Sequence, residues 1–122
     1  TTPIDAHTLD PGAIASRDSA TLTKLVVRLL NGDYHGATEL FAKDYRRRVT
    51  PDGIAQAIGN VGAEVGMFRR IAAKRRVPMD LKDGSRVYRV VAVTSRDRHV
   101  SFTVTLNRNG EVAGLFVRTL GS

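Results

Sequence analysis

The sequence predicts an α+β domain in which three N-terminal helices are followed by a mainly antiparallel sheet of four strands. Before Gly66, apolar residues recur at the three- and four-residue spacing of helices, and after it they recur at alternate positions. Near the C-terminus, Asn109-Gly110 separates two apolar, β-rich runs, which is a strong signal for a tight hairpin. Helices that precede an antiparallel sheet pack on one of its faces, so this order predicts a two-layer domain.

Residues 1–17 contain two prolines and a glycine and show no sustained period, so we expect an extended N-terminal arm or linker there. A single domain is expected over residues 18–122. Asp18 or Ser19 is suited to cap the first helix, because a short polar side chain can accept hydrogen bonds from the free amides of the first turn. The apolar face of this helix then consists of Leu22, Leu25, Val26, Leu29 and Leu30.

Two further helices are expected. Asn31-Gly32 ends the first helix and Asp33 can cap the second, whose apolar stripe is Tyr34, Ala37, Leu40 and Phe41. Tyr45 and three arginines follow as its polar exit. Thr50-Pro51 predicts the start of the third helix, because proline needs no amide hydrogen at the first helical position. Its buried face holds Ile54, Ile58, Val61 and Val65, and Gly66 can close it.

Four strands are expected after Gly66, within Phe68–Val77, Arg86–Thr94, His99–Leu106 and Glu111–Thr119. Pro78 indicates either an edge position for the first strand or a break in it, since proline cannot donate to the ladder of a central strand. The second and fourth strands are apolar on both faces, whereas strands of a sheet covered on one face alternate. We therefore expect the outer sheet face to be buried by a second copy of the chain or by a neighbouring domain.

The composition bounds the possible chemistry. A chain of 122 residues forms one domain with a core that needs no covalent staple. It has no cysteine, which excludes disulfides, thiolate metal sites and cysteine nucleophiles, and it has no apolar run long enough to span a membrane. The chain begins at Thr1 without methionine, and with the lack of cysteine this leads us to expect a processed, exported protein, with a cytoplasmic location left open.

The charge of +7 is concentrated in one segment, because Gly66–His99 holds ten Lys/Arg and three Asp/Glu while the remainder is neutral. The densest part is a basic patch formed by Arg69, Arg70, Lys74, Arg75 and Arg76. Such a field attracts nucleic acid, anionic lipid or an acidic protein face. We favour the plainer interpretation of the patch as a solvated edge strand, because charged edges resist aggregation.

The segment Leu25–Tyr45 resembles the opening of nuclear transport factor two-like domains, with a helix, a Gly-Asp turn and a second helix ending in a Leu-Phe pair. Thr50–Phe68 and Asn109–Leu115 are similar to the uncharacterised bacterial branch of that superfamily, found alone or in front of α/β-hydrolase or serine β-lactamase-like domains. The resemblance implies a cone-shaped, often dimeric domain, with three helices packed in the concave face of a curved sheet. It implies no single activity, because this fold hosts enzymes and binding modules.

The residues themselves predict no catalytic, metal or cofactor site. Glu111 lies beside the hairpin turn, and no carboxylate lies within Arg86–Thr94, His99–Leu106 or Val112–Thr119, so the buried strand acid that proton abstraction needs is missing. His7, His35 and His99 have no ligand spacing between them. Core packing is the favoured interpretation of the aromatic residues. The alternative is an apolar ligand pocket, with a histidine near the cone mouth, and its candidates are Tyr34, His35, Phe41, Tyr88 and Phe102.

We therefore expect a non-catalytic ligand-binding or protein-interaction domain, accessory to an exported bacterial protein. One alternative is a small-molecule isomerase or cyclase-type enzyme that uses the cone pocket with an unusual base such as His35. A second alternative is a polyanion binder that uses the basic patch at residues 69–76. Nucleic acid is the less favoured partner, because the basic stretch has no aromatic residues among its bases for stacking.

Overall fold

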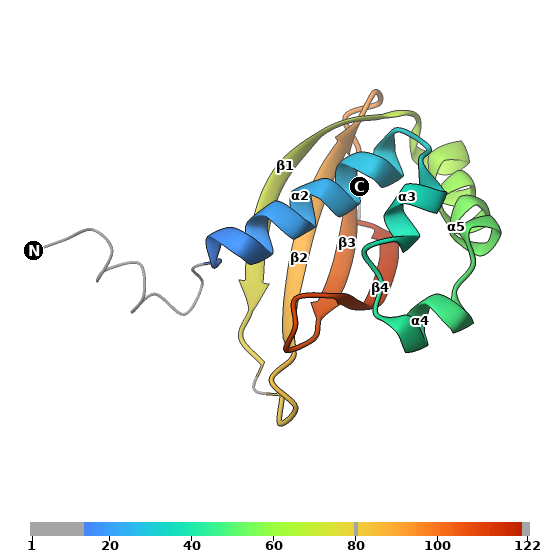
Figure 1. Ribbon diagram of the computed structural model, residues 1–122. Helices are drawn as coiled ribbons and strands as arrows, with labels where there is room; N and C mark the ends of the chain where they lie inside the picture. Colours follow the sequence, from blue (N-terminus) through green and yellow to red (C-terminus); the bar gives the residue numbers. More distant parts are fainter. Residues whose placement is uncertain (1–13, 80, 121–122) are drawn as a thin grey trace, which may run out of the picture.

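The computed structural model describes residues 14–79 and 81–120, and these form four helices and one open, antiparallel sheet (Figure 1). The helices are α2 (Ser16–Leu30), α3 (Tyr34–Thr38), α4 (Lys43–Arg48) and α5 (Pro51–Val65). The strands are β1 (Phe68–Val77), β2 (Arg86–Thr94), β3 (His99–Leu106) and β4 (Val112–Thr119). The predicted α+β class is confirmed, and α2 crosses one face of the sheet.

Helix α2 starts earlier than its predicted caps. It begins at Ser16, so Asp18 lies inside the first turn, where it makes no cap hydrogen bond and is only 1% exposed. The predicted arm therefore ends before residue 16, and most of it, residues 1–13, lies outside the described residues. The predicted apolar face is buried as expected, with Leu22, Leu25, Val26 and Leu29 facing the core.

The predicted second helix is divided into α3 and α4, so the expectation of three helices is wrong. Asp33 caps α3 as predicted, accepting a hydrogen bond from the Gly36 amide. The chain then extends, and Phe41 forms a parallel bridge with Val112 of β4. The Ala42 amide donates to the Val112 carbonyl and the Val112 amide donates to the Leu40 carbonyl, at 2.7 and 2.9 Å. These bonds to β4 require extended backbone, which interrupts the helix.

Helix α5 matches its predicted signals at both ends. The Thr50 hydroxyl accepts from the Gly53 amide, and Pro51 occupies the first helical position. Gly66 ends the helix with a φ of 96°, a conformation that favours glycine. The Thr94 hydroxyl of β2 donates to the Val65 carbonyl at 2.7 Å, so the last turn of α5 is tied to the sheet.

The sheet has the strand order β1-β2-β3-β4, and each strand pairs antiparallel with the next. The predicted hairpin between β3 and β4 is present. Its Gly110 has a φ of 82°, whereas Asn109 has negative φ, and the Gly110 amide donates to the Asn107 carbonyl. Only the glycine of the Asn-Gly pair uses the left-handed conformation, which is typical of a longer hairpin loop rather than a two-residue turn.

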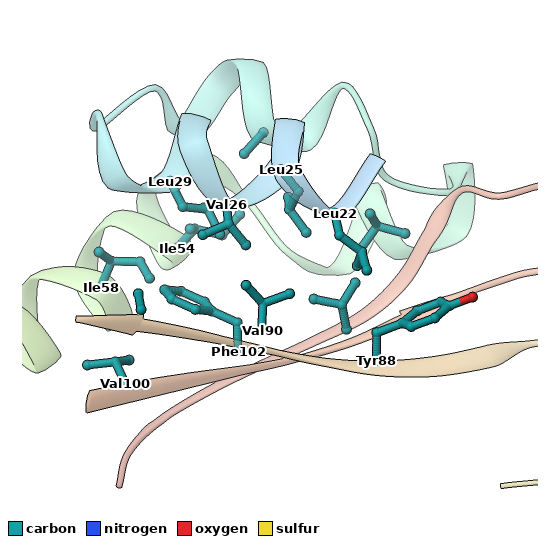
Figure 2. Close-up of a cluster of buried hydrophobic side chains, with 14 of the residues drawn as sticks. Leu22, Leu25, Val26, Leu29, Ile54, Ile58, Tyr88, Val90, Val100 and Phe102 are labelled. Carbon is teal, nitrogen blue, oxygen red and sulfur yellow. The ribbon is translucent and has the colours of Figure 1, made fainter. Parts of the chain in front are cut away.

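The core lies between the helices and one sheet face (Figure 2). Tyr88, Val90, Val100 and Phe102 point toward α2 and α5 and are almost fully buried. Alternation places Val91, Val93 and Phe116 on the opposite face, which explains why β2 and β4 are apolar on both sides. In β4 the alternation is shifted by a bulge at Ala113, so Val112 and Leu115 both face the core.

Candidate functional site

An apolar cavity of about 470 Å³ opens between the end of α2, helix α5 and the start of β1. Leu29 and Leu30 of α2, Ile58 of α5 and Phe68 of β1 supply its largest apolar walls. Met67, which joins α5 to β1, is 79% exposed and lies at its rim. The size and the mainly apolar lining are those of small-molecule sites in proteins.

Two glycines of α5 make room for this cavity. A Cβ atom built on Gly59 or Gly62 would meet no other atom within 4 Å, so both positions face open space. Each glycine costs helix stability, by roughly 1 kcal/mol relative to alanine. The two glycines thus lower the stability of α5 but leave space in the cavity that larger side chains would fill.

Gly66 forms part of the cavity wall and is required there for two reasons. Its φ of 96° disfavours any other residue, and a Cβ would lie 2.9 Å from Ser95 Oγ and 3.1 Å from Arg96 Cγ. The stem of Arg96 therefore packs directly over the Gly66 backbone. The arginine is exposed and belongs to the lining of the cavity.

The polar lining of the cavity is sparse. Tyr34 and Arg96 are its polar side chains, and the lining residues in the described part of the chain include no carboxylate and no histidine. A phenol and a guanidinium can donate hydrogen bonds to a ligand, but neither is suited to take a proton at neutral pH. The arrangement can therefore orient an anionic group at the rim while an apolar body enters the cavity.

A broader depression of about 680 Å³ runs along the other side of α2, lined by residues such as Ser19, Thr23 and Val27. Two of its hydroxyl groups already have a partner, because Lys74 Nζ of β1 donates to Ser19 Oγ at 2.7 Å and to Thr23 Oγ1 at 2.8 Å. These contacts hold α2 against β1. The cavity beside α5 is thus the better candidate for a ligand site.

A buried ionic cluster joins the first turn of α2 to β2, and it consists of Asp18, Arg86 and Tyr88. Arg86 donates through Nε to Asp18 Oδ2 at 2.5 Å and through Nη2 to Asp18 Oδ1 at 3.0 Å. The Tyr88 hydroxyl donates a short hydrogen bond to Asp18 Oδ2. A two-point guanidinium–carboxylate contact of this kind is among the stronger polar interactions in proteins.

The cluster holds its charges in place. Burial acts to raise the pKa of Asp18, but the hydrogen bonds from Arg86 and Tyr88 and the arginine charge outweigh it, so the pKa lies below its usual value. Burial and the contact with Asp18 raise the pKa of Tyr88. The hydrogen bond to Asp18 raises the pKa of Arg86. An ionised carboxylate that accepts hydrogen bonds from two side chains cannot serve as a proton donor near neutral pH. We therefore interpret the cluster as structural.

The sequence held a signal for this cluster. Asp18 precedes Leu22 by four positions and therefore lies on the same helical face as the buried leucines. On β2, Arg86 and Tyr88 lie two positions apart and thus share one face of the strand. An acid on an apolar helix face, with a base and a phenol on one strand face, indicates a buried ion pair.

The structure separates the predicted pocket residues. Tyr34 lines the cavity, whereas His35 is exposed on α3. Phe41 is buried beside Tyr45, with 4.9 Å between the ring centroids. Tyr88 and Phe102 belong to the packed core, and Phe102 reaches the cavity only through Phe68, whose ring centroid is 6.0 Å away. Of the five candidate pocket residues, Tyr34 is therefore the one that lines this cavity.

The predicted basic patch is divided between the two sides of β1. Lys74 and Arg76 pair with Val90 and Tyr88, whose side chains face the helices. Arg70 and Arg75 pair with Val93 and Arg89 on the outer side, and Arg69 is exposed at a bulge. Strand alternation explains this division, since five neighbouring cations on a strand cannot form one surface.

Within residues 14–79 and 81–120, no three His, Asp or Glu side chains are grouped as metal ligands would be. Across the same residues, no helix combines the length and the apolar character that crossing a membrane requires. A comparison with protein-family models finds no match for the chain, and a comparison with curated proteins finds none either. The interpretation of the site therefore rests on its geometry.

Proposed function

We propose that this chain is a non-catalytic binding domain that holds a small amphipathic anion in the cavity between α2, α5 and β1. In this proposal the helices and sheet form the cone of nuclear transport factor two-like domains, and the ligand enters at the end of the cone near Gly66. The observation that carries the proposal is a mainly apolar cavity of about 470 Å³ with a single cation, Arg96, in its lining. An accessory role in an exported bacterial protein remains a prediction.

Apolar burial is expected to dominate the affinity. Each buried methylene group of a ligand contributes about 0.8 kcal/mol, whereas an exposed ion pair contributes about 0–1 kcal/mol. Because Arg96 is exposed, its charge orients the ligand more than it strengthens binding. Affinity should therefore rise with the length of the apolar chain and depend weakly on salt.

The geometry favours binding over catalysis. His35, the base of the alternative enzyme hypothesis, is exposed and does not line the cavity. Asp18, a buried acid, is held by Arg86 and Tyr88 near the opposite end of α2. Neither residue is placed to exchange a proton with a molecule bound beside Gly62.

Filling the cavity tests the proposal. Octanoate is a suitable probe, since it combines a flexible apolar chain with a carboxylate. We expect Gly62→Leu to abolish octanoate binding in isothermal titration calorimetry, because the new side chain extends into open space. The variant should be as stable as the wild type or more stable, by about 1 kcal/mol, since glycine in a helix is unfavourable.

Asn60→Leu is the matched control, because it adds the same side chain at an exposed position of α5 that does not line the cavity. It should bind octanoate like the wild type. Equal binding by Gly62→Leu and the wild type would show that the cavity is not the site. A wild type that binds no octanoate or longer-chain carboxylate would contradict the proposed function itself.

The role of Arg96 can be tested separately. We expect Arg96→Gln to weaken octanoate binding by about two- to fivefold, corresponding to less than about 1 kcal/mol for an exposed ion pair. Binding of octanol, the neutral analogue, should be unchanged. If both ligands lose affinity equally, then Arg96 acts through packing over Gly66 and not through its charge.

A further inference from the structure

The outer sheet face, which points away from the helices, carries a defined pattern that the cavity does not explain. The strand register aligns its side chains in rows across the four strands. One row consists of Arg75, Arg89, Thr103 and Phe116. The adjacent row consists of Ala73, Val91, Ser101 and Arg118. Arg75 and Arg89 thus lie on β1 and β2 and Arg118 lies on β4, and the other positions of the two rows are apolar or carry small hydroxyl groups.

The arginines of this face lack acidic partners within the described residues. The two ion pairs there are Arg28–Glu39 and Arg86–Asp18, and neither includes Arg75, Arg89 or Arg118. No strand of the sheet contains an Asp or Glu. Arg75 and Arg89 lie directly opposite each other, an arrangement of like charges that destabilises a sheet. The fold therefore maintains an unbalanced positive surface at a cost in stability.

Apolar groups among these arginines give the face the features of a protein contact. Phe116 of the edge strand β4 is 62% exposed, an unusual state for a large aromatic side chain, and Val91, two strands away on β2, is partly exposed. On β3, between these strands, the Ser101 hydroxyl is buried and has no hydrogen-bond partner in the described residues. Protein–protein interfaces combine apolar and polar groups in this way and are enriched in arginine and aromatic residues.

We propose that the outer sheet face binds an acidic protein segment, with an apolar residue on Phe116 and Val91 and carboxylates on Arg75, Arg89 and Arg118. Guanidinium groups bind carboxylates through two parallel hydrogen bonds, which gives each contact geometric specificity. This surface is separate from the cavity, since it lies on the opposite side of the sheet from the helices. The proposal therefore stands independently of the proposed function.

The charge and composition of the face favour an acidic segment over a second copy of the chain and over a single-stranded nucleic acid. A second copy of the chain would bring its own arginines against Arg75 and Arg89, and such like-charge contacts cost several kcal/mol. A single-stranded nucleic acid stacks its bases on several aromatic side chains, whereas Phe116 is the one aromatic residue on the outer faces of these strands. An acidic segment with one apolar anchor satisfies both the charge and the exposed phenylalanine.

The test begins with a display library of random linear peptides selected against the full chain. We expect the selected peptides to combine Asp and Glu with a Leu or aromatic residue. The strongest peptide is then measured by fluorescence polarisation against the double variant Arg75→Glu/Arg89→Glu and against Phe116→Ala. The matched control, Lys43→Glu/Arg47→Glu, reverses two exposed charges on α4.

The double reversal at the outer sheet face should weaken binding at least tenfold, which corresponds to about 1.4 kcal/mol, and the α4 control should change it less than about twofold. Phe116→Ala should also weaken binding severalfold, which attraction between charges alone would not produce. Thermal melts verify that each variant is folded.

Three outcomes would overturn the proposal. The first is the absence of acidic enrichment among the selected peptides. The second is a single-stranded oligonucleotide that displaces the peptide and binds more tightly through the same arginines, which would assign the face to nucleic acid. The third is a wild-type dimer, detected by light scattering, that Phe116→Glu converts to a monomer, because a second copy would then occupy the face.

Discussion

Asp18→Asn is expected to lower the free energy of unfolding by about 3 kcal/mol at neutral pH. Removing one member of a buried ion pair costs about 3–5 kcal/mol, because the remaining charge is left without compensation. Arg86 keeps 20% of its side chain exposed, so water can partly hydrate it and the lower end of this range applies. The substitution also leaves the Tyr88 hydroxyl with a weaker acceptor than the carboxylate it now contacts.

The loss should depend on pH in a defined direction. The pKa of Asp18 is lower in the folded protein than its usual value of 3.8, so the unfolded chain takes up a proton first as the pH falls. The contribution of Asp18 is therefore complete above the unfolded pKa and is lost as the pH decreases through the folded pKa. Urea unfolding should show a difference between the wild type and Asp18→Asn that is constant from neutral pH to about pH 5 and shrinks below pH 4.

Asp44→Asn is the matched control, because Asp44 is exposed in the first turn of α4 and makes no side-chain contact with a cation in the described residues. Its cost should stay below about 1 kcal/mol, the range of a carboxylate near a helix N-terminus. Equal losses for the two variants, or a loss for Asp18→Asn that persists unchanged at low pH, would contradict the assignment of Asp18 to a buried ion pair.

Val90→Glu is expected to prevent folding, whereas Phe116→Glu should leave the protein folded and nearly as stable as the wild type. Val90 and Phe116 both belong to strands that are apolar on both faces. However, Val90 is fully buried under α2, whereas Phe116 is 62% exposed. An ionised carboxylate in the core costs several kcal/mol, which is comparable to the 5–15 kcal/mol that stabilises a typical domain. A surface substitution changes stability by about 0.5 kcal/mol.

Far-ultraviolet circular dichroism and thermal melts compare the two variants directly. The two residues lie on opposite faces of the sheet. The bulge at Ala113 shifts the alternation of β4, and the register places Val90 opposite the core residue Phe102. A folded Val90→Glu would contradict this arrangement of the sheet.

The sequence predicts elements well where one local signal dominates. Helix α5 was predicted from Thr50, Pro51 and Gly66, and all three act as expected. β1, β2 and β3 have their predicted bounds, because β-rich runs are bounded by clear turn residues along this part of the chain. The local signals fail where a distant segment takes part. The bridge from Phe41 to Val112 joins positions far apart in the sequence, and it divides a helical pattern that is otherwise continuous.

The candidate site was only partly predictable for a related reason. Aromatic residues were expected to line a pocket, but Tyr88 and Phe102 are large enough to fill the space between α2 and the sheet. The cavity instead lies where small residues leave space, at Gly59 and Gly62. From the sequence alone, these glycines could equally indicate a helix of low stability or the wall of a cavity. Their role becomes visible only when α2 and β1 are placed around them.

Backbone amide spectra recorded during a titration with octanoate locate the ligand on the protein. We expect saturable shifts at Gly59, Gly62, Gly66 and Phe68, which surround the cavity. Amides of the outer sheet face, such as Arg89 and Thr103, and those around Asp18 should not move. Saturable shifts that are centred on the outer face or on the Asp18 cluster, with none at Gly62 and Gly66, would contradict the assignment of this cavity as the ligand site.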